Sequence, residues 1–446
     1  MPASHRSIVV RNLAAAALDG PWTSRSIAGR FQRAITEKPK WLAGIAKKIV
    51  AAFPDGIHPS KIDALAAVIL EAIAITWARS DTPGLTIREL FVVHPVMQPA
   101  HGWPIPMIST AADVAAWLGL TTRELDWFAD VQGRNHRQPQ CRLRHYTHRW
   151  VAKKGGRYRL LEVPKSRLKA IQRTILQSLL NRIPCHEAAH GFRFGRSVQT
   201  FVSPHVGRAA VWRIDLKDFF PSIAAARVRA IFVEAGYPTE VAQLLTGLCT
   251  TRLAAGVKYP DASGIAPLYD ERHLPQGAPT SPALANLAAY RLDVRLASWA
   301  AACGANYTRY ADDLAFSGQA DFAKSGPRFR SMVFQIILEE GFRPNAAKSR
   351  WMTHGGRQQL AGVVVNCHPN VRRDDYDRLK AILTNCARLG PGGQNRDHRP
   401  DFRAYLRGKV AHVTATNATR GERLMAIFDA IAWPDSHARS SPREVN

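Results

Sequence analysis

The sequence lacks three features that would place it in other classes of protein. Its six cysteines are scattered, and no two of them form a C-x-x-C pair. This argues against a zinc site and against a disulfide framework, and it is typical of a protein of the reducing cytoplasm. No run of about 20 apolar residues occurs, so we expect no membrane span. The amino-terminal stretch also lacks the pattern of a signal peptide.

Acidic residues are few relative to basic ones. The chain has 61 Lys and Arg against 35 Asp and Glu, which gives a formal net charge of +26. A surplus this large is hard to explain by solubility alone and suits a polyanionic partner, to which binding would depend steeply on salt. Charge alone leaves ribosomal and chromatin proteins open. With 446 residues the chain is long enough for two or three domains.

Two adjacent carboxylates stand at a predicted turn between two β-rich runs, in the segment Tyr310-Ala311-Asp312-Asp313. Like charges side by side repel each other, and the local sequence offers no cation that would neutralise both. A divalent metal ion would explain the pair, because Mg²⁺ prefers carboxylate oxygens and polymerases use two such ions for phosphoryl transfer. Alone, an Asp-Asp pair is more often a solvated turn, so the hypothesis needs further residues.

A third carboxylate, Asp215, lies on a predicted strand over residues 211–216. The alternation of a strand places Val211, Arg213 and Asp215 on one face. Asp215 can therefore lie beside the Asp312–Asp313 hairpin. Pro221 is expected to stop this strand and to start a helix at Ile223.

Two further segments complete the pattern. The Gly- and Pro-rich segment Leu274-Pro275-Gln276-Gly277-Ala278-Pro279-Thr280-Ser281-Pro282 predicts a rigid loop followed by a helix. The segment Gly341-Phe342-Arg343-Pro344-Asn345-Ala346-Ala347-Lys348 follows the hairpin. Taken singly, each of these residues has a plain structural explanation. Their order and spacing carry the interpretation.

Together these segments resemble the palm of reverse transcriptases. The resemblance implies an α+β, right-hand polymerase fold, with fingers, an antiparallel palm sheet and a helical thumb. It implies that Asp215, Asp312 and Asp313 hold two Mg²⁺ ions, for which Mn²⁺ can substitute, and that Lys348 protonates the leaving pyrophosphate. Gln276 and Gly277 would position the nucleotide and template. Phe220 would reject a ribose 2′-hydroxyl and so favour deoxynucleotides.

Residues 141–164 are basic and predict a β-hairpin, with strands over 146–151 and 158–163 around a Lys153-Lys154-Gly155-Gly156 turn. By itself such a tip is a solvated turn. In the family the fingers hairpin holds the incoming nucleotide, which assigns that role to Lys153 and Arg159. After Pro164, a helix is predicted with Leu168, Ile171, Ile175 and Leu179 on its buried stripe.

Residues 1–104 predict a helical amino-terminal extension, with amphipathic stretches over 11–18, 41–53 and 62–77. Residues 109–125 then read as helix, turn and helix, with Gly119 as a stop and Thr121 with Glu124 as a capping box. A DNA-reading role is one interpretation of this outline. A helical lead-in to the fingers is the favoured one.

Two segments resemble the retron group of bacterial reverse transcriptases. Residues 189–207 resemble the retron insertion, whose Asn-Ala-x-x-His signature is here Phe201-Val202-Ser203-Pro204-His205 and keeps only the histidine. A second mark, Val-Thr-Gly before an apolar strand and Asn, is here Leu360-Ala361-Gly362 with Asn366. The resemblance implies RNA contacts by His205 and, in the basic thumb, by Arg372, Arg373, Arg407 and Lys409.

The expected domains are 1–104 (extension), 105–208 (fingers with the retron-like insertion), 209–368 (palm), 369–433 (thumb) and 434–446 (a Ser- and Arg-rich disordered tail). The expected function is copying of a structured non-coding RNA into short single-stranded DNA, primed from an RNA 2′-hydroxyl, with a role in defence against phage. The expected partners are that RNA, its DNA copy, dNTPs and a toxin or effector protein, in the cytoplasm and without a membrane.

Three alternatives stay open. A group II intron-like or other defence reverse transcriptase would share the palm, although an intron maturase normally carries a larger maturase or endonuclease region. An RNA-templated RNA polymerase is disfavoured by Phe220. A catalytically silent RNA-binding scaffold is disfavoured because all three carboxylates are present.

Overall fold

The structure is a computed structural model that describes residues 3–37, 39–57, 61–77, 85–91, 97, 99, 101–138, 142–152, 158–257 and 266–433. The chain forms two compact units, one from residues 1–137 and 229–249 and the other from residues 138–228 and 250–446. In the part of the chain that the structure describes, no helix is both long and apolar enough to cross a membrane.

The first unit is helical. Its helices are α1 (Ala3–Leu18), α2 (Ser24–Ala34), α3 (Leu42–Ala52), α4 (Ile62–Trp77), α5 (Ala111–Leu118), α6 (Thr122–Ala129), the short η2 (Asn135–Arg137) and α10 (Thr239–Cys249). The residues of α9 (Ala225–Glu234) are divided between the two units after Val228. Helices α1 to α4 enclose one apolar core around Leu13, Phe31 and Ile69. The three predicted amphipathic stretches are confirmed as helices. Helix α2, capped by Thr23, was not predicted.

The predicted helix, turn and helix over residues 109–125 is also confirmed. Helix α5 ends at Gly119, whose φ of 62° is the left-handed conformation that glycine adopts without strain. Thr121 and Glu124 form the predicted capping box at the start of α6, with Thr121 Oγ1 accepting from the Glu124 amide at 3.2 Å.

The second unit combines helices with antiparallel sheets, as the α+β prediction requires. Its elements before the central hairpin are β1 (Tyr146–Ala152), β2 (Tyr158–Pro164), α7 (Ser166–Ser178), η3 (Leu180–Arg182), α8 (Val198–Val202), η4 (Ser203–His205), β3 (Ala210–Leu216), α11 (Ala266–Asp270), α12 (Ser281–Ala288) and α13 (Tyr290–Ala302). The elements that follow are β4 (Asn306–Tyr310), β5 (Asp313–Gly318), α14 (Ala320–Lys324), α15 (Gly326–Glu339), β6 (Pro344–Thr353), β7 (Gln359–Leu360), β8 (Val363–Val364), α16 (Arg373–Leu389), η5 (Gly392–Gln394), α17 (Phe402–Thr416) and α18 (Ala418–Asp429).

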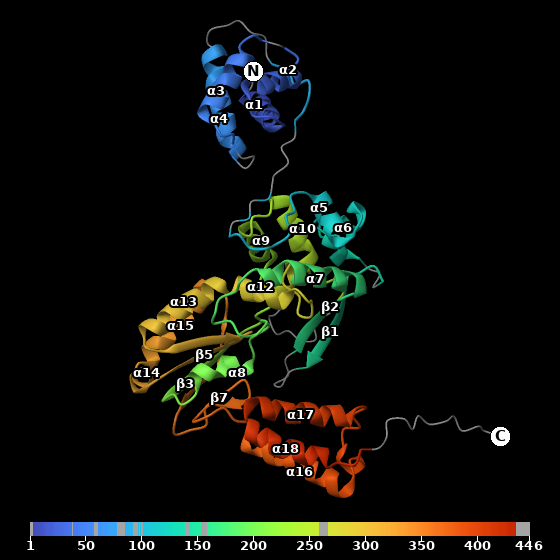
Figure 1. The fold of residues 1–446 in the computed structure, drawn as a ribbon, viewed down its shortest axis with the longest axis vertical. Helices are drawn as coiled ribbons and strands as arrows, with labels where there is room; N and C mark the ends of the chain where they lie inside the picture. Colours follow the sequence, from blue (N-terminus) through green and yellow to red (C-terminus); the bar gives the residue numbers. More distant parts are fainter. Residues whose placement is uncertain are drawn as a thin grey trace, which may run out of the picture. The chain divides into compact units, whose positions relative to one another are not determined.

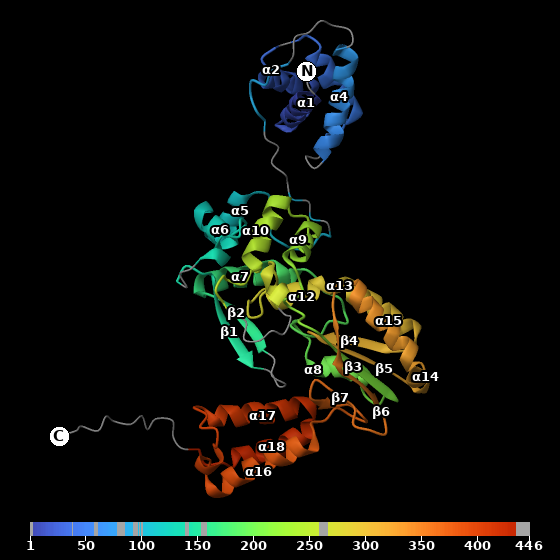
Figure 2. The ribbon, with the colours of Figure 1, turned by 180° about the vertical axis from the view of Figure 1, so that it is seen from behind.

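The main sheet has the strand order β4-β5-β3-β6, with every described pair antiparallel (Figures 1 and 2). Its two faces follow the predicted alternation of β3. Trp212 and Phe316 stack at 5.4 Å between ring centroids and meet Phe329 of α15 on one face. Val211 lies on the other face, in a core with Phe201 of α8. Burial of both faces fixes the register, because a slip by one residue would exchange them.

The carboxyl-terminal helices α16, α17 and α18 share a separate apolar core that includes Leu383, Val410 and Leu424. Buried positions recur at helical spacing along each of these helices. This confirms the small helical unit predicted after about residue 370. The predicted disordered tail, residues 434–446, lies outside the described residues.

Candidate active site

Asp215 and Asp313 face each other across two neighbouring strands. They are paired residues in the antiparallel register of β3 and β5, and Asp312 immediately precedes β5. The amide of Leu216 donates to the carbonyl of Asp312 at 2.9 Å, which ties the end of β3 to the hairpin. Asp215 is therefore gathered at one end of the sheet with Asp312 and Asp313, which follow it by about 100 positions in the sequence.

The hairpin turn that carries Asp312 is strained. Tyr310 pairs with Asp313, so only Ala311 and Asp312 join β4 to β5. Ala311 has a φ of 57°. A side chain in this left-handed region costs roughly 1–2 kcal/mol, so surrounding contacts must hold the turn in place.

The carboxylates are electrostatically unusual. Burial, followed by the charges of Asp215 and Asp313, raises the pKa of Asp312 above its ordinary value. Burial also raises the pKa of Asp313, although the guanidinium of Arg213 acts in the opposite direction. A bound cation would favour the ionised form of both groups.

Cations from other strands lie at two of the three carboxylates, consistent with the absence of a local cation in the sequence. Arg213 donates to Asp313, with Nε and Nη2 at 2.9 and 2.7 Å from Oδ1. Lys348 Nζ donates to Asp215 Oδ2 at 3.1 Å, and Asn345 Nδ2 donates to the same oxygen at 2.9 Å. Arg213 and Lys348 lie 100 and 133 residues from their partners, so the local sequence does not reveal the pairs.

The side chains of the site match the ligand preference of divalent metal ions. Asp215, Asp312 and Asp313 supply the carboxylate oxygens that Mg²⁺ and Mn²⁺ prefer. Within the described ranges, however, no three His, Cys, Asp or Glu side chains converge as a ready metal cluster. Two of these carboxylates also accept hydrogen bonds from cations, Asp313 from Arg213 and Asp215 from Lys348.

A buried polar network supports the hairpin from behind. Arg309 is fully buried, and its Nε and Nη2 donate to Asp293 of α13 at 2.7 and 2.6 Å. Its Nη1 donates to Asn286 of α12 at 2.9 Å and to the carbonyl of the strained Ala311 at 3.1 Å. Tyr307 donates its hydroxyl to Asp293 at 2.8 Å. A buried ion pair with all its hydrogen bonds satisfied is rigid, so the network fixes the turn next to Asp312.

The segment predicted as a nucleotide loop lies against the β1–β2 hairpin. The carbonyl of Gln276 accepts from the amide of Glu162 on β2 at 3.0 Å. Gly277 has a φ of 138°, and a Cβ at this position would lie 2.9 Å from the Glu162 carbonyl oxygen. Glycine is required there for both reasons. The Oε2 of Glu162, itself fully buried, accepts from His273 Nε2 at 2.8 Å and so braces the start of the loop.

The predicted fingers hairpin is confirmed as β1 paired with β2. Arg159 pairs with Val151 and has an exposed side chain. Lys153, predicted at the tip, lies outside the described residues.

Strand β3 ends at Leu216, as predicted for residues 211–216, although Pro221 is not the residue that stops it. The helix that follows begins at Ala225 rather than at Ile223. Asp218 has a left-handed φ of 48°, so the chain turns before Pro221 is reached. Phe220 contacts Phe219 and Phe192, at 5.7 and 6.2 Å between ring centroids.

His205 does not contact solvent, which corrects the predicted RNA contact. Its ring is fully buried in η4, where Nδ1 bonds Ser317 at 2.7 Å and Nε2 bonds Thr308 at 2.8 Å. Burial lowers the pKa of His205 to about 3. A ring with both nitrogens occupied inside the protein has no atom left for RNA, so its role here is to pin η4 to β4 and β5. Asn366 of the second retron mark likewise bonds the backbone at His354 and Gly356.

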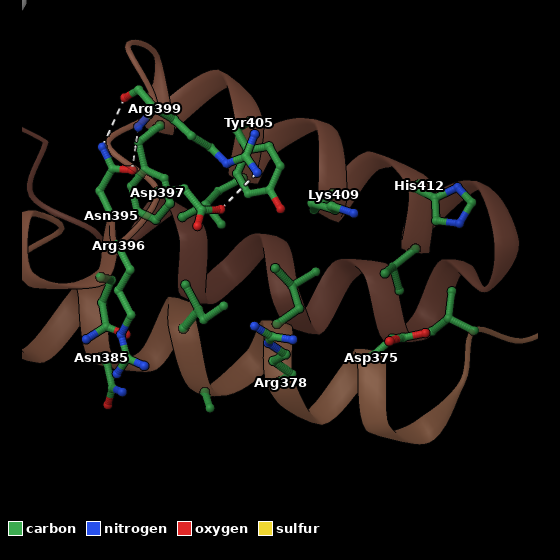
Figure 3. Close-up of a pocket in the computed structure, with 18 of the residues that line it drawn as sticks. Asp375, Arg378, Asn385, Asn395, Arg396, Asp397, Arg399, Tyr405, Lys409 and His412 are labelled. Atoms are coloured by element: carbon green, nitrogen blue, oxygen red, sulfur yellow. Dashed lines mark hydrogen bonds and ion pairs between the residues drawn. The ribbon is translucent and has the colours of Figure 1, made fainter. Parts of the chain in front are cut away.

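A groove of about 720 Å³ lies along α16 and α17 (Figure 3). Its labelled residues include the cations Arg378, Arg396, Arg399 and Lys409, together with His412, Tyr405 and the acidic Asp375 and Asp397. The Arg399 guanidinium lies over the Tyr405 ring at 4.0 Å. Cations, amides and an aromatic ring in one groove are typical of a nucleic-acid surface.

The other predicted thumb residues differ in their surroundings. Arg372 lines the groove and donates to Asp374 at 3.0 Å. Arg373 is exposed and lies 3.6 Å from Asp377. Arg407 is exposed on α17, next to the groove that Lys409 lines.

An antiparallel sheet that carries three carboxylates at one end, with helices packed on it, is the arrangement that the resemblance to a polymerase palm predicts. The family model described as reverse transcriptase (RNA-dependent DNA polymerase) matches residues 151–381, just over half the chain. The retron Mx65 reverse transcriptase of Myxococcus xanthus is 41% identical over 320 residues, covering 72% of this chain and 71% of the relative.

Two further relatives are similar. The retron Mx162 enzyme of the same organism is 34% identical over 350 residues (75% of this chain, 69% of the relative). The retron Ec86 enzyme of Escherichia coli is 33% identical over 245 residues (54% of this chain, 69% of the relative). The chain belongs to the reverse transcriptase family, as a retron-type member. It is an RNA-directed DNA polymerase, and hence a nucleotidyltransferase, as the sequence predicted.

Sequence reasoning missed the residues that support the site. Arg213 was placed on the correct face of β3 but without a role. Asp293 and Asn286 were not considered, because each is an ordinary polar residue in a helical pattern. The only available signal was polarity at positions where α12 and α13 otherwise require apolar residues.

Proposed function

We propose that this enzyme copies a structured RNA into DNA at the carboxylate cluster of Asp215, Asp312 and Asp313. The observation that carries the proposal is the pairing of Asp215 with Asp313 in the register of β3 and β5, with Asp312 in the adjoining turn. In this proposal residues 105–208 form the fingers, 209–368 the palm and 369–433 the thumb. Residues 1–104 form a helical extension.

The three carboxylates would hold two Mg²⁺ ions, or Mn²⁺ in their place. Such ions neutralise charge on the attacking and leaving oxygens of a phosphoryl transfer. The raised pKa values of Asp312 and Asp313 support this assignment. Burial and neighbouring carboxylates destabilise the ionised form of these groups, and a bound cation would stabilise it. Arg213 keeps Asp313 ionised and aligned until substrate arrives.

Side chains around the cluster would bind and select the nucleotide. Arg159 and Lys153 would bind the triphosphate, and Gln276 with Gly277 would place the base pair. Phe220, held by Phe219 and Phe192, would leave no room for a 2′-hydroxyl. Lys348, 3.1 Å from Asp215 and largely exposed, would deliver a proton to the leaving pyrophosphate.

The groove along α16 and α17 would bind the cognate RNA. Arg372 and Lys409 line it, and Arg373 and Arg407 are exposed on the same helices. These contacts would be mainly to phosphates, which dominate the affinity of basic surfaces for nucleic acid and carry no sequence information.

The retron relatives support a finer proposal about the product. The template would be a structured non-coding RNA, and synthesis would start from one of its 2′-hydroxyls to give a branched RNA–DNA molecule. A defence role against phage, with a toxin or effector partner, belongs to the same proposal. No feature of the described residues favours an intron maturase or a silent scaffold over it.

The experiment is to purify the protein from its native locus and to sequence the nucleic acid that accompanies it, with and without RNase and debranching treatment. One short DNA joined to a structured RNA supports the proposal. In parallel, Asp312→Asn and Asp313→Asn variants should lose synthesis by at least 10³-fold, on the order expected for groups that act directly in the chemistry. Retained synthesis by both variants would remove the cluster from the mechanism.

A further inference from the structure

The loop over residues 190–197 carries two exposed aromatic side chains next to the carboxylate hairpin. Phe192 is 51% exposed, and Phe194 is fully exposed. Single exposed apolar residues are common on proteins, but large aromatic rings are among the costliest to leave in water. Two of them on one short loop beside the carboxylate hairpin form an aromatic surface that a ligand can contact.

The loop holds Phe192 in an unfavourable conformation. Its φ is 60°, in the left-handed region that a bulky residue rarely adopts. The ring lies 6.2 Å from that of Phe220 and 6.4 Å from that of Tyr310, the residue before the hairpin turn. Strain of this kind persists where surrounding structure imposes it, and it is concentrated at functional sites.

The base of the loop is fixed to the hairpin. The amide of His190 donates to the Arg309 carbonyl at 2.7 Å, and the carbonyl of Gly191 accepts from Asn286 Nδ2 at 2.8 Å. A Cβ on Gly191 would lie 2.6 Å from the Ala311 nitrogen, so only glycine permits this approach. The position of Phe192 is thereby coupled to that of Asp312.

The far side of the loop is braced by charge. Arg193 Nη2 donates to Glu187 Oε1 at 2.6 Å, and Arg196 donates to the other oxygen of the same carboxylate. The fully exposed ring of Phe194 therefore projects from a loop that is held at both ends. A rigid loop loses little entropy when its side chains bind a ligand.

We propose that the loop over residues 190–197 binds unpaired bases of the RNA template by stacking, with Phe194 as the outer contact and Phe192 as the contact nearest the site. An exposed aromatic ring with cations close by is the arrangement that binds single-stranded nucleic acid without reading its sequence. Stacking requires an open base face, which base-paired segments do not offer. In an enzyme that copies RNA, the unpaired strand that approaches the carboxylates is the template.

Phe194 offers an unusually direct test, because a fully exposed side chain has no intramolecular packing to lose. We expect Phe194→Ala to weaken binding of an unstructured RNA oligonucleotide by about fivefold or more, the loss of roughly one stacked base, while the unfolding temperature stays unchanged. Phe194→Tyr should retain affinity. Phe194→Leu, which keeps apolar surface without an aromatic face, should not.

The matched control is Leu90→Ala, which removes a 70% exposed apolar side chain from the other compact unit. It should leave RNA affinity unchanged. Fluorescence anisotropy without dNTPs measures binding alone. Unchanged affinity in Phe194→Ala, or equal affinity in Phe194→Leu and the parent, would overturn the inference.

A crosslinking experiment identifies what the loop touches. With p-benzoylphenylalanine in place of Phe194, irradiation of the enzyme with the same unstructured RNA oligonucleotide should give a crosslink to RNA. A crosslink only to another protein would overturn the proposal in favour of a protein-docking loop.

The inference rests on the proposal that the reaction occurs at Asp312 and Asp313. The two can fail separately. If Asp312→Asn and Asp313→Asn remain active, the proposed site is wrong whatever Phe194 does. If they are inactive while Phe194→Ala binds RNA normally, only the stacking loop is wrong.

Discussion

Arg213 Nη2 lies 2.7 Å from Asp313 Oδ1, so the carboxylate proposed to bind metal is already paired with a cation from the next strand. The site has two requirements that this ion pair must satisfy. In the proposed mechanism the carboxylates must be ionised to bind metal, and Arg213 must leave oxygens of Asp313 available to the ion. Arg213 is partly exposed and can meet both requirements.

Replacing Arg213 should shift the pH dependence of synthesis. Arg213 lowers the pKa of Asp313, so Arg213→Gln should raise it and move the acid limb of the kcat profile to higher pH. At a pH above the acid limbs of both the parent and the variant, the kcat of the variant should approach that of the parent. The control is Arg350→Gln, which removes a cation from the position opposite Arg213 on β6. An unshifted acid limb in Arg213→Gln would contradict the assignment.

Neutralising Asp312 should stabilise the metal-free protein. Burial and neighbouring carboxylates raise the pKa of Asp312, so the folded state binds its proton more tightly than the unfolded state does. The ionised form therefore destabilises the fold at neutral pH, and this penalty disappears below the ordinary carboxylate range. We expect Asp312→Asn to raise the unfolding temperature by about 1–3 °C at pH 7.5, with no gain at pH 3.5.

Mg²⁺ supplies the complementary measurement. It should raise the unfolding temperature of the parent more than that of Asp312→Asn, because the variant lacks one carboxylate ligand. Equal Mg²⁺ responses, or a lower unfolding temperature for the variant at pH 7.5, would contradict the proposed electrostatics.

Removing Asn286 should misplace the hairpin without unfolding the protein. Asn286→Ala takes a partner from Arg309 and from Gly191 but leaves the buried Arg309–Asp293 ion pair in place. We expect kcat to fall by about tenfold or more, because small misplacements at an active site are costly. Ala311→Gly should partly restore kcat in the double variant, since glycine adopts the left-handed turn without support.

The matched control for Asn286 is Asn12→Ala. Both asparagines are 3% exposed, and Asn12 also bonds backbone groups, at Glu89 and Phe91. Asn12→Ala should lower the unfolding temperature and leave kcat unchanged. If the two variants lose kcat equally, the effect of Asn286 is general instability rather than positioning.

The basic groove should account for part of the salt dependence of RNA binding. The double change Arg407→Ala/Lys409→Ala removes two cations at the groove, and each lost phosphate contact to a single strand should reduce the log–log salt slope by about 0.7. The double change Lys47→Ala/Lys48→Ala removes the same charge from exposed positions of α3. An identical slope change in both would show that net charge, and not the groove, is responsible.

Several elements could be predicted from the sequence because their signals are local. The β1–β2 hairpin, the capping box at Thr121 and the stripe of α7 were all confirmed, since each depends on residues within a few positions of one another. The start of α9 was misplaced by two residues, because the chain leaves β3 through a left-handed turn at Asp218 and not at Pro221. His205 was misassigned because a motif does not show whether its histidine is buried.

The sequence by itself determined the family, the strand that carries Asp215 and the hairpin that carries Asp312 and Asp313. These follow from short motifs, alternation and their order along the chain. Only the tertiary structure decided which cations neutralise the carboxylates and what supports the strained Ala311. Arg213, Lys348, Asn286 and Asp293 reach the site from other strands and helices. Coulombic and hydrogen-bond energies depend on distance in space, which separation along the chain does not specify.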